Sequence, residues 1–224
     1  MKRIFLALAL MLGMALPSIA AAEGTGLYLA PKFLMSFQNT GQMERSSGLA
    51  GSGVGQYSQF TLGGALALGY DFWPQQMLPL RAELEFALRG NSETSWDDGG
   101  LMREVKGTWN STTLFANLFW DFHNDTIMTP YVGAGLGMAF NYAGYDFTDR
   151  AGNTFSGDER TTNFAWNVGA GVAFNINDHF TIDAAYRFVG LGYNEVSVSS
   201  GGNDYTVGNR PYNNEFMLGL RYGF

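Results

Sequence analysis

The two histidines of this chain, His123 and His179, are its most obvious candidates for acid–base catalysis. A histidine that removes the proton of a serine hydroxyl could support hydrolysis through a covalent intermediate. Both histidines lie in short polar segments, D-F-H-N-D and I-N-D-H-F, without a serine in the arrangement that such a mechanism needs. We expect them to be exposed turn residues, and a hydrolase acting on lipid is a less favoured alternative.

Charged side chains form a second group of chemical interest, because many stand at alternate positions of otherwise apolar segments. In residues 78–89, L-P-L-R-A-E-L-E-F-A-L-R, the leucines and Phe86 occupy one parity and the charges occupy the other. A helix would scatter these charges around its circumference, whereas a strand places them on one face. Ten charged residues that share this face are Lys32, Arg81, Glu83, Glu85, Arg89, Asp121, Asp183, Arg187, Glu215 and Arg221.

These charges could neutralise one another if their common face were enclosed. Asp71 shares the face, and the two signs are nearly balanced. Buried charges persist in proteins when they are paired. We therefore predict a network of ion pairs and hydrogen bonds that fills an interior. The alternative is a narrow or gated ion path whose selectivity the same residues would set.

An acidic segment, Y-D-F-T-D-R-A-G-N-T-F-S-G-D-E, is a third candidate, here for binding a divalent cation. Its acids are Asp146, Asp149, Asp158 and Glu159. The order of residues is not the D-x-D-x-D-G order of a calcium loop, so a solvated acidic loop is favoured. We expect no metal and no other cofactor.

Composition limits the class of protein that could carry these residues. The 224 residues suit one domain, and 30 glycines with 15% aromatic and only 15% charged residues favour an all-β fold. The net charge of −7 and the lack of clustered Lys and Arg argue against a nucleic-acid partner.

The N-terminal residues have the pattern of an export signal. Lys2 and Arg3 precede an apolar core, residues 4–16, and a small-residue cleavage site at residues 20–22. We predict a signal peptide at 1–22, with the mature domain spanning 23–224. The chain has no cysteine, so neither disulfides nor a lipid-bearing thiol is expected.

The rest of the chain alternates between bulky apolar and small or polar residues with a period of two, which indicates strands. No stretch is apolar for long enough to form a membrane-spanning helix. Eight such segments are predicted as strands, namely 27–37, 59–72, 78–89, 112–122, 130–142, 163–175, 180–188 and 215–224.

The connections between these segments alternate in length. Four long polar connections are expected at 39–58, 91–108, 143–162 and 191–213, and three short ones at 73–77, 123–128 and 176–179. Long loops at one end and tight turns at the other are typical of an outer-membrane barrel, with the turns on the periplasmic side.

Side-chain volume decides which face of the strands points inward. Eight strands enclose a space that side chains fill or that holds one small ligand, as in a soluble lipocalin. The Leu, Phe, Trp and Tyr face is too bulky for that space, whereas the Gly, Ala, Asn and charged face fits. We therefore predict an eight-stranded antiparallel transmembrane up-and-down β-barrel with a polar lumen and a lipid-facing apolar exterior.

The closing segment N-E-F-M-L-G-L-R-Y-G-F resembles the insertion signal that the barrel-assembly machinery reads in outer-membrane barrels. The matching residues are Leu218, Leu220, Tyr222 and Phe224, which the alternation places toward lipid. The segments T-P-Y-V-G-A-G-L-G-M-A-F, N-L-F-W-D-F and F-T-I-D-A-A-Y-R-F-V-G-L-G resemble strands of the opacity-type surface antigens and the OmpA membrane domain.

That resemblance implies a monomer in the outer membrane of a Gram-negative bacterium, in contact with lipid and lipopolysaccharide. It implies a structural or surface-interaction role through the loops, with host or other surface molecules as partners; a small gated channel is the alternative. The loops carry spaced aromatics suited to adaptable contacts, with Trp109 and Tyr193 expected in an outer aromatic girdle. These aromatics are Tyr57, Trp96, Trp109, Tyr145, Phe155, Tyr193, Tyr205 and Tyr212.

Overall fold

The computed structural model describes residues 25–41, 43–45, 57–97, 102–200 and 203–224. The predicted signal peptide at 1–22 lies outside the described residues. Within the described part of the chain, no helix is long and apolar enough to cross a membrane.

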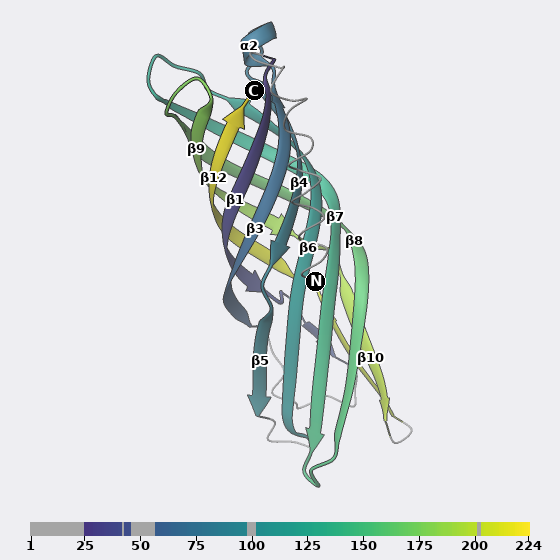
Figure 1. Ribbon diagram of the computed structural model, residues 1–224. Coiled ribbons are helices and arrows are strands. Elements are labelled where there is room, and N and C mark those ends of the chain that lie inside the picture. The colour runs from purple at the N-terminus through teal and green to yellow at the C-terminus, as the bar shows by residue number, and fades with distance from the viewer. Residues whose placement is uncertain (1–24, 42, 46–56, 98–101, 201–202) are drawn as a thin grey trace, which may run out of the picture.

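Eight long antiparallel strands form a closed ring (Figure 1). The ring closes because β1 pairs with β12, and because β4 pairs with β6. The predicted all-β, eight-stranded antiparallel barrel is therefore confirmed. In chain order its strands are β1 (Leu27–Asn39), β3 (Ser58–Asp71), β4 (Leu80–Arg89), β6 (Met102–Asp121), β7 (Met128–Asp149), β8 (Thr154–Asn175), β9 (Phe180–Gly190) and β12 (Tyr212–Gly223).

Shorter elements lie at the two ends of the barrel. The helix α2 (Trp73–Gln76) occupies the connection between β3 and β4, at the same end as the start of β1 and the end of β12 (Figure 1). We call this the turn end. The opposite, hairpin end carries β2 (Met43–Arg45), β5 (Ser92–Asp97), β10 (Asn194–Ser200) and β11 (Asn203–Asn209).

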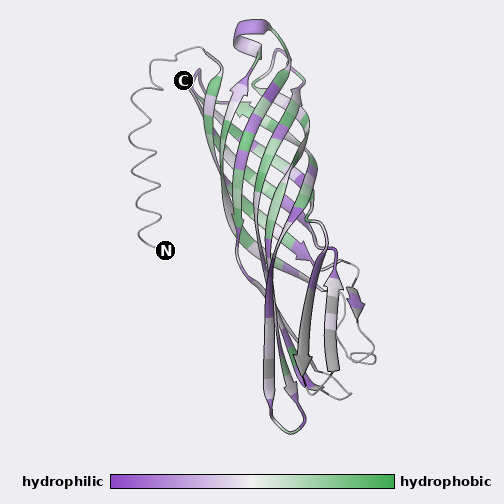
Figure 2. Cartoon of the chain, turned by 90° about the vertical axis from the view of Figure 1, so that its right-hand side faces the viewer, coloured by the Kyte–Doolittle hydropathy of each residue, from purple (hydrophilic) through white to green (hydrophobic). Residues whose placement is uncertain are grey.

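The bulky residues of each strand point outward and the small or polar residues point inward. On β7, Val132, Leu136 and Phe140 are exposed, Leu136 by 61%, while Tyr131 and Asn141 on the other face are buried. Figure 2 shows the hydrophobic residues concentrated in the barrel portion of the molecule. This is the arrangement that side-chain volume predicts for eight strands.

Large rings inside the barrel are accommodated by glycines opposite them. Phe119 on β6 faces Gly133 on β7, and Tyr131 on β7 faces Gly171 on β8. A Cβ atom on either glycine would collide with the ring. Glycine thus clears the space that allows an aromatic side chain to enter so narrow a lumen.

The prediction of a long loop at 191–213 is wrong, because β10 and β11 pair there as a hairpin. The prediction of long loops at 91–108 and 143–162 is also wrong. β5 covers residues 92–97, and β6, β7 and β8 continue through most of these ranges, so that β7 and β8 are joined by only four residues. The cross-strand pairs run without interruption from Met128–Phe174 to Thr148–Thr154. Strand pairing therefore extends well beyond the apolar part of the barrel.

An inversion of polarity explains these strand extensions. Along the apolar part of β7 the outward residues are large and apolar, but farther along the outward residues are Gly144, Asp146 and Thr148. The inward residues change in the opposite sense, since Tyr145 and Phe147 are buried there. Beyond the lipid-facing band the sheet is polar outside and apolar inside, like that of a water-soluble protein.

Trp109 lies in this inner cluster and not in an outer girdle, contrary to the prediction. Its side chain is only 8% exposed and contacts the rings of Tyr57, Trp96 and Tyr145 at centroid distances of 5.1, 5.7 and 5.4 Å. The inward parity of Trp109 on β6 places it there, because the girdle would require an outward position.

Of the other loop aromatics, Tyr193 is exposed and donates its hydroxyl to Glu195 at 3.0 Å. Tyr212 stacks on Phe188 with a centroid distance of 5.3 Å. The side chains of Phe155 and Tyr205 lie outside the described residues.

Asp149 organises the turn between β7 and β8. Its carboxylate accepts hydrogen bonds from the backbone and the side chain of Asn153, both at 2.8 Å. Gly152, within the same turn, has a φ of 89°. These bonds lower the pKa of the Asp149 carboxyl, and the bond from the Asn153 side chain contributes most. Among the described residues, no three Asp, Glu or His side chains gather as a metal site, so the cation-binding alternative finds no ligand set there.

Phe224 departs from the alternation that predicts a lipid-facing ring. Leu218, Leu220 and Tyr222 are exposed as expected, but Phe224 is only 8% exposed. Its backbone N–H donates to the Leu27 carbonyl at 3.0 Å, and its ring lies edge-on to Tyr222. The role of these four residues as an insertion signal stays a prediction.

Substitution Leu220→Arg is expected to impair folding into bilayers. Arginine on a lipid face costs about 2–4 kcal/mol at the midplane and less toward the interfaces. The folded fraction can be measured by the heat-dependent shift of gel mobility after refolding into vesicles, with Leu220→Ala as the control. Equal folding of the two variants would contradict the assigned exterior.

Candidate functional site

Eight of the ten predicted lumen charges form one chain in which acids and bases alternate. Asp121, Glu83, Glu85 and Glu215 contribute four negative charges, and Arg81, Lys32, Arg187 and Arg89 contribute four positive ones. The formal charges therefore cancel along the chain. The order of contacts is Asp121, Arg81, Glu83, Lys32, Glu85, Arg187, Glu215 and Arg89.

The centre of this ion chain joins strands from opposite sides of the barrel. Lys32 Nζ on β1 lies 2.5 Å from Glu83 and 2.8 Å from Glu85, both on β4. Arg187 on β9 donates to Glu85 at 2.5 Å and to Glu215 at 2.7 Å. The carboxylates of Glu83, Glu85 and Glu215 each contact two basic side chains. Removal of one ion pair would therefore leave a neighbouring buried charge with fewer partners.

The ion chain ends, toward the hairpin end of the barrel, at Arg89. Two nitrogens of its guanidinium donate hydrogen bonds to the Glu215 carboxylate. A third nitrogen of Arg89 donates to the Thr113 hydroxyl at 3.1 Å. Ser36 also donates to Glu215, at 3.2 Å. Glu215 is thus fully enclosed by donors, as a buried carboxylate requires.

At the turn end, Arg81 binds Asp121 through two hydrogen bonds of 2.6 and 3.0 Å. Its guanidinium also lies close to the rings of Phe119 and Tyr131, 4.8 and 4.7 Å from their centroids. These two rings are edge-on to each other, and both add a cation–π contact to the ion pair with the carboxylate.

The remaining two predicted residues form a separate pair near the turn end. Arg221 on β12 donates to both oxygens of Asp183 on β9, at 2.7 and 3.1 Å. Asp71, on the same face, instead accepts the backbone N–H of Trp73 at 2.9 Å and begins the short helix α2.

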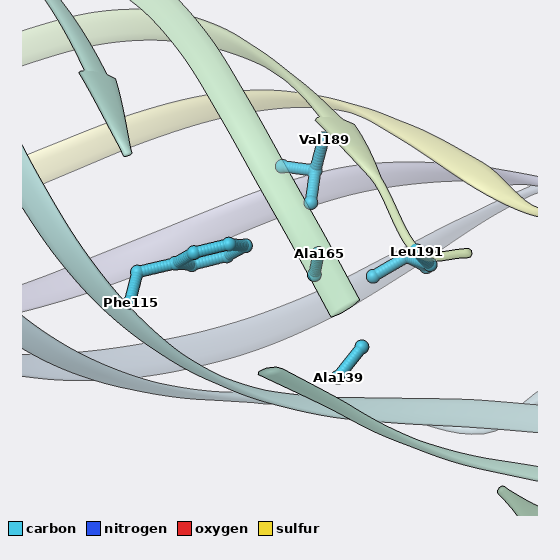
Figure 3. Close-up of a cluster of buried hydrophobic side chains, with 5 residues drawn as sticks. All are labelled: Phe115, Ala139, Ala165, Val189 and Leu191. Carbon is cyan, nitrogen blue, oxygen red and sulfur yellow. The ribbon is translucent and has the colours of Figure 1, made fainter. Parts of the chain in front are cut away.

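An apolar layer lies in the lumen next to the ion chain. Figure 3 shows the side chains of Phe115, Ala139, Ala165, Val189 and Leu191 directed toward one another. All five are buried, and the Phe115 ring lies 5.8 Å from the Arg187 guanidinium. The layer comes from four successive strands and their immediate continuation, β6 to β9.

Beyond this layer, at the hairpin end, the lumen becomes an amide-rich cavity that we call the outer mouth. It is lined by Gln38, Asn39, Thr40, Tyr57, Ser92, Trp109, Asn110, Ser111, Asn141, Tyr142, Leu191, Asn194, Asn209, Pro211 and Asn213. Asn141 Nδ2 donates to the Leu191 carbonyl at 3.0 Å and to Asn194 Oδ1 at 3.2 Å.

The residual space around the ion chain is very small. A cavity beside Lys32, Glu85, Phe119 and Arg187 has a volume of about 20 Å³, which is room for about one water molecule. Side chains therefore fill the middle of the barrel.

The two histidines lie at the turn end, far from the outer mouth. His123 is exposed and stacks on Trp73 with a centroid distance of 3.9 Å. His179 is exposed, and its Nδ1 lies 3.2 Å from the Gly223 carbonyl. The structure places both in the short connections where the sequence pattern put them.

Sequence reasoning missed the neutral partners of the ion chain. Tyr28 donates its hydroxyl to Glu83 at 2.8 Å, and Ser36 donates to Glu215 at 3.2 Å. The inward parity of these residues could have indicated them. Phe115 and Phe119 are bulky residues at inward positions of β6, and both contact buried cations.

Comparison with known proteins agrees with this architecture. Residues 6–224 match the family model described as outer membrane protein beta-barrel domain. The chain belongs to this family of outer-membrane barrels. The expected location in the outer membrane is thereby confirmed, and the hairpin end is the extracellular end by the rule that short turns face the periplasm.

Among relatives in this family, the outer membrane protein PagN of Salmonella typhimurium is 32% identical over 176 residues, which is 72% of each chain. Two solved structures share the fold alone. OprG of Pseudomonas aeruginosa covers 89% of this chain and 97% of its own at 14% identity, with a TM-score of 0.51. The protease OmpT of Escherichia coli covers 88% and 96% at 10% identity, with a TM-score of 0.52.

Substitution Glu215→Gln should strongly destabilise the barrel, because it leaves Arg89 and Arg187 without their shared counter-ion. Breaking a buried ion pair in this way typically costs about 3–5 kcal/mol. The free energy of unfolding in guanidinium chloride, measured in detergent micelles, is the readout.

A matched control removes a carboxylate charge on the surface of the same protein. Glu93 pairs with Lys106 at 3.5 Å, with both side chains about half exposed. Glu93→Gln should change the unfolding free energy by about 1 kcal/mol or less. Similar effects of the two substitutions would show that the lumen network does not carry the expected stability.

Proposed function

We propose that the protein is a closed, non-conducting barrel that anchors an extracellular contact surface for host or neighbouring surface molecules. The observation that carries this proposal is the paired extension of β7 and β8 beyond the lipid-facing band. Six consecutive pairs, from Ala143–Glu159 to Thr148–Thr154, continue above it. At about 3.3 Å per residue they add roughly 15–20 Å of ordered sheet that membrane anchoring alone does not require.

The surface of this extension is suited to contact with other molecules. Its outward residues are polar, while Val105, Trp109, Tyr145 and Phe147 form an apolar interior that holds the strands together. A scaffold that is rigid beneath and polar above is a common basis for recognition by loops. The ion chain supports the non-conducting part of the proposal, because it leaves so little free volume in the lumen.

We propose no catalytic role. Each histidine is exposed at the periplasmic end, where neither lipid A nor an extracellular substrate is available to it. The likeness to the protease OmpT is a likeness of fold at 10% identity, and fold alone does not transfer an activity.

A conductance measurement tests the closed lumen. The full chain, inserted into planar bilayers, should produce no steady conductance steps, because alternating side chains occupy the middle of the barrel. Regular, ion-selective steps from the purified full chain would contradict the proposal and favour the small gated channel.

Shortening the β7–β8 hairpin tests the contact surface. Ala143 and Glu159 already face each other, so replacing residues 144–158 by Asn-Gly creates a two-residue hairpin turn that suits antiparallel strands. The shortened barrel should still insert, which heat-modified gel mobility checks. Attachment of bacteria carrying it to cultured epithelial cells should fall about tenfold or more relative to the full chain.

The outcomes separate clearly. Equal attachment by the two proteins would place any contact outside this hairpin, and no attachment above that of bacteria lacking the protein would remove the proposed role toward host surfaces.

A further inference from the structure

The outer mouth combines enclosure with polar groups that the protein itself leaves unpaired. Trp109 Nε1, Ser111 Oγ, Asn141 Oδ1 and Asn209 Nδ2 have no hydrogen-bond partner among the described residues. All four side chains are more than nine-tenths buried, and all four line the same cavity. Buried polar atoms of folded proteins are usually paired, so four unpaired ones in one cavity indicate a site for a ligand.

The unpaired groups specify the hydrogen bonds that such a ligand must make. Asn141 Oδ1 can only accept, Asn209 Nδ2 can only donate, and Ser111 Oγ can do both. A hydroxyl group both donates and accepts, so neighbouring hydroxyls match this set. A ligand with acceptors alone would leave the Asn141 oxygen unsatisfied.

The electrostatics of the cavity favour a neutral ligand. None of the described residues that line it is an Asp, Glu, Lys, Arg or His. A phosphate, sulfate, carboxylate or ammonium group would enter without a counter-ion and would lose its hydration. The Glu215 carboxylate, which accepts a hydrogen bond from the lining residue Asn213 at 3.4 Å, is already neutralised by Arg89.

Size and shape point to the end of a larger molecule. The free space in the cavity is about 30 Å³, room for about two water molecules, which suits a pair of adjacent hydroxyls or a hydroxymethyl group. Tyr57 and Trp109 line the cavity with rings tilted by 36° and 5.1 Å apart. Aromatic faces of this kind pack against the C–H groups of a sugar ring.

We propose that the outer mouth binds the terminal sugar of a neutral glycan, with its hydroxyls on Ser111, Asn141 and Asn209 and its ring against Tyr57. This proposal rests on the proposed contact function and names its chemistry. The same terminal sugar could belong to a host glycan or to the O-polysaccharide of a neighbouring bacterium.

The experiment uses the full chain refolded in detergent micelles. Methyl glycosides of glucose, galactose, mannose and N-acetylglucosamine serve as probes, and binding is measured by saturation-transfer difference NMR. At least one glycoside should bind, and competition by host-type oligosaccharides or by purified O-polysaccharide then identifies the source.

Two substitutions at Ser111 test the site itself. Ser111→Ala removes one hydrogen bond to the ligand and should raise the Kd about three- to tenfold. Since the Ser111 hydroxyl has no partner within the described protein, the same change should not lower the unfolding midpoint. Ser111→Leu should fill the cavity and abolish binding, while Ser58→Ala, on the exposed face of β3, should leave the Kd unchanged.

Failure of this inference can be told apart from failure of the proposed function. Absence of binding by all four glycosides, with water alone in the cavity, overturns the inference, as does unchanged affinity in Ser111→Leu. If bacteria that carry the full chain attach to cells, and bacteria that carry the Ser111→Leu variant attach equally well, the contact function is supported and the sugar site is contradicted. If the full chain does not attach at all, the contact function falls instead.

Discussion

Eight strands enclose so little volume that each charge inside the barrel must find its counter-ion within a few ångströms. The lumen meets this constraint by alternating acids and bases in one continuous chain from Asp121 to Arg89. Rings over Arg81 and Arg187 complete the enclosure on the faces that carboxylates leave open. Packing this charged core into a narrow, closed ring of strands leaves no room inside for the bulky apolar residues, which lie on the exterior. The inner rings that do enter the lumen require glycines opposite them.

Strand parity, the alternating lengths of the connections and side-chain volume were enough to predict the barrel and the inward position of its ten charges, because a period of two sorts side chains by face. They could not predict which charges meet. Lys32 contacts Glu83 and Glu85 across the intervening strand β3, and such contacts depend on the stagger of the strands around the ring. Phe115 and Phe119 do not fit the pattern of small or polar inward residues, and the reason, their contacts with cations, is visible only in the folded structure.

The extracellular strands escaped prediction for a different reason. A lipid-facing strand is indicated by an outer face rich in large apolar residues, and that face ends near Tyr142. Beyond it the apolar residues move inside, to Tyr145 and Phe147, so the alternation persists with its sense reversed. Polar composition indicated a loop where a water-facing sheet is formed. The same change gives the outer mouth its mixed lining of amides and rings.

This reversal also fixes the height of the barrel in the membrane. A shift of two residues along β7, about 6–7 Å of strand, would carry Asp146 toward hydrocarbon or bring Leu136 and Phe140 toward water, depending on its direction. Both displacements are unfavourable, so the molecule has one preferred depth. Whatever the outer mouth meets is therefore held at a constant distance above the lipid surface, and molecules too short to cross that distance cannot take part.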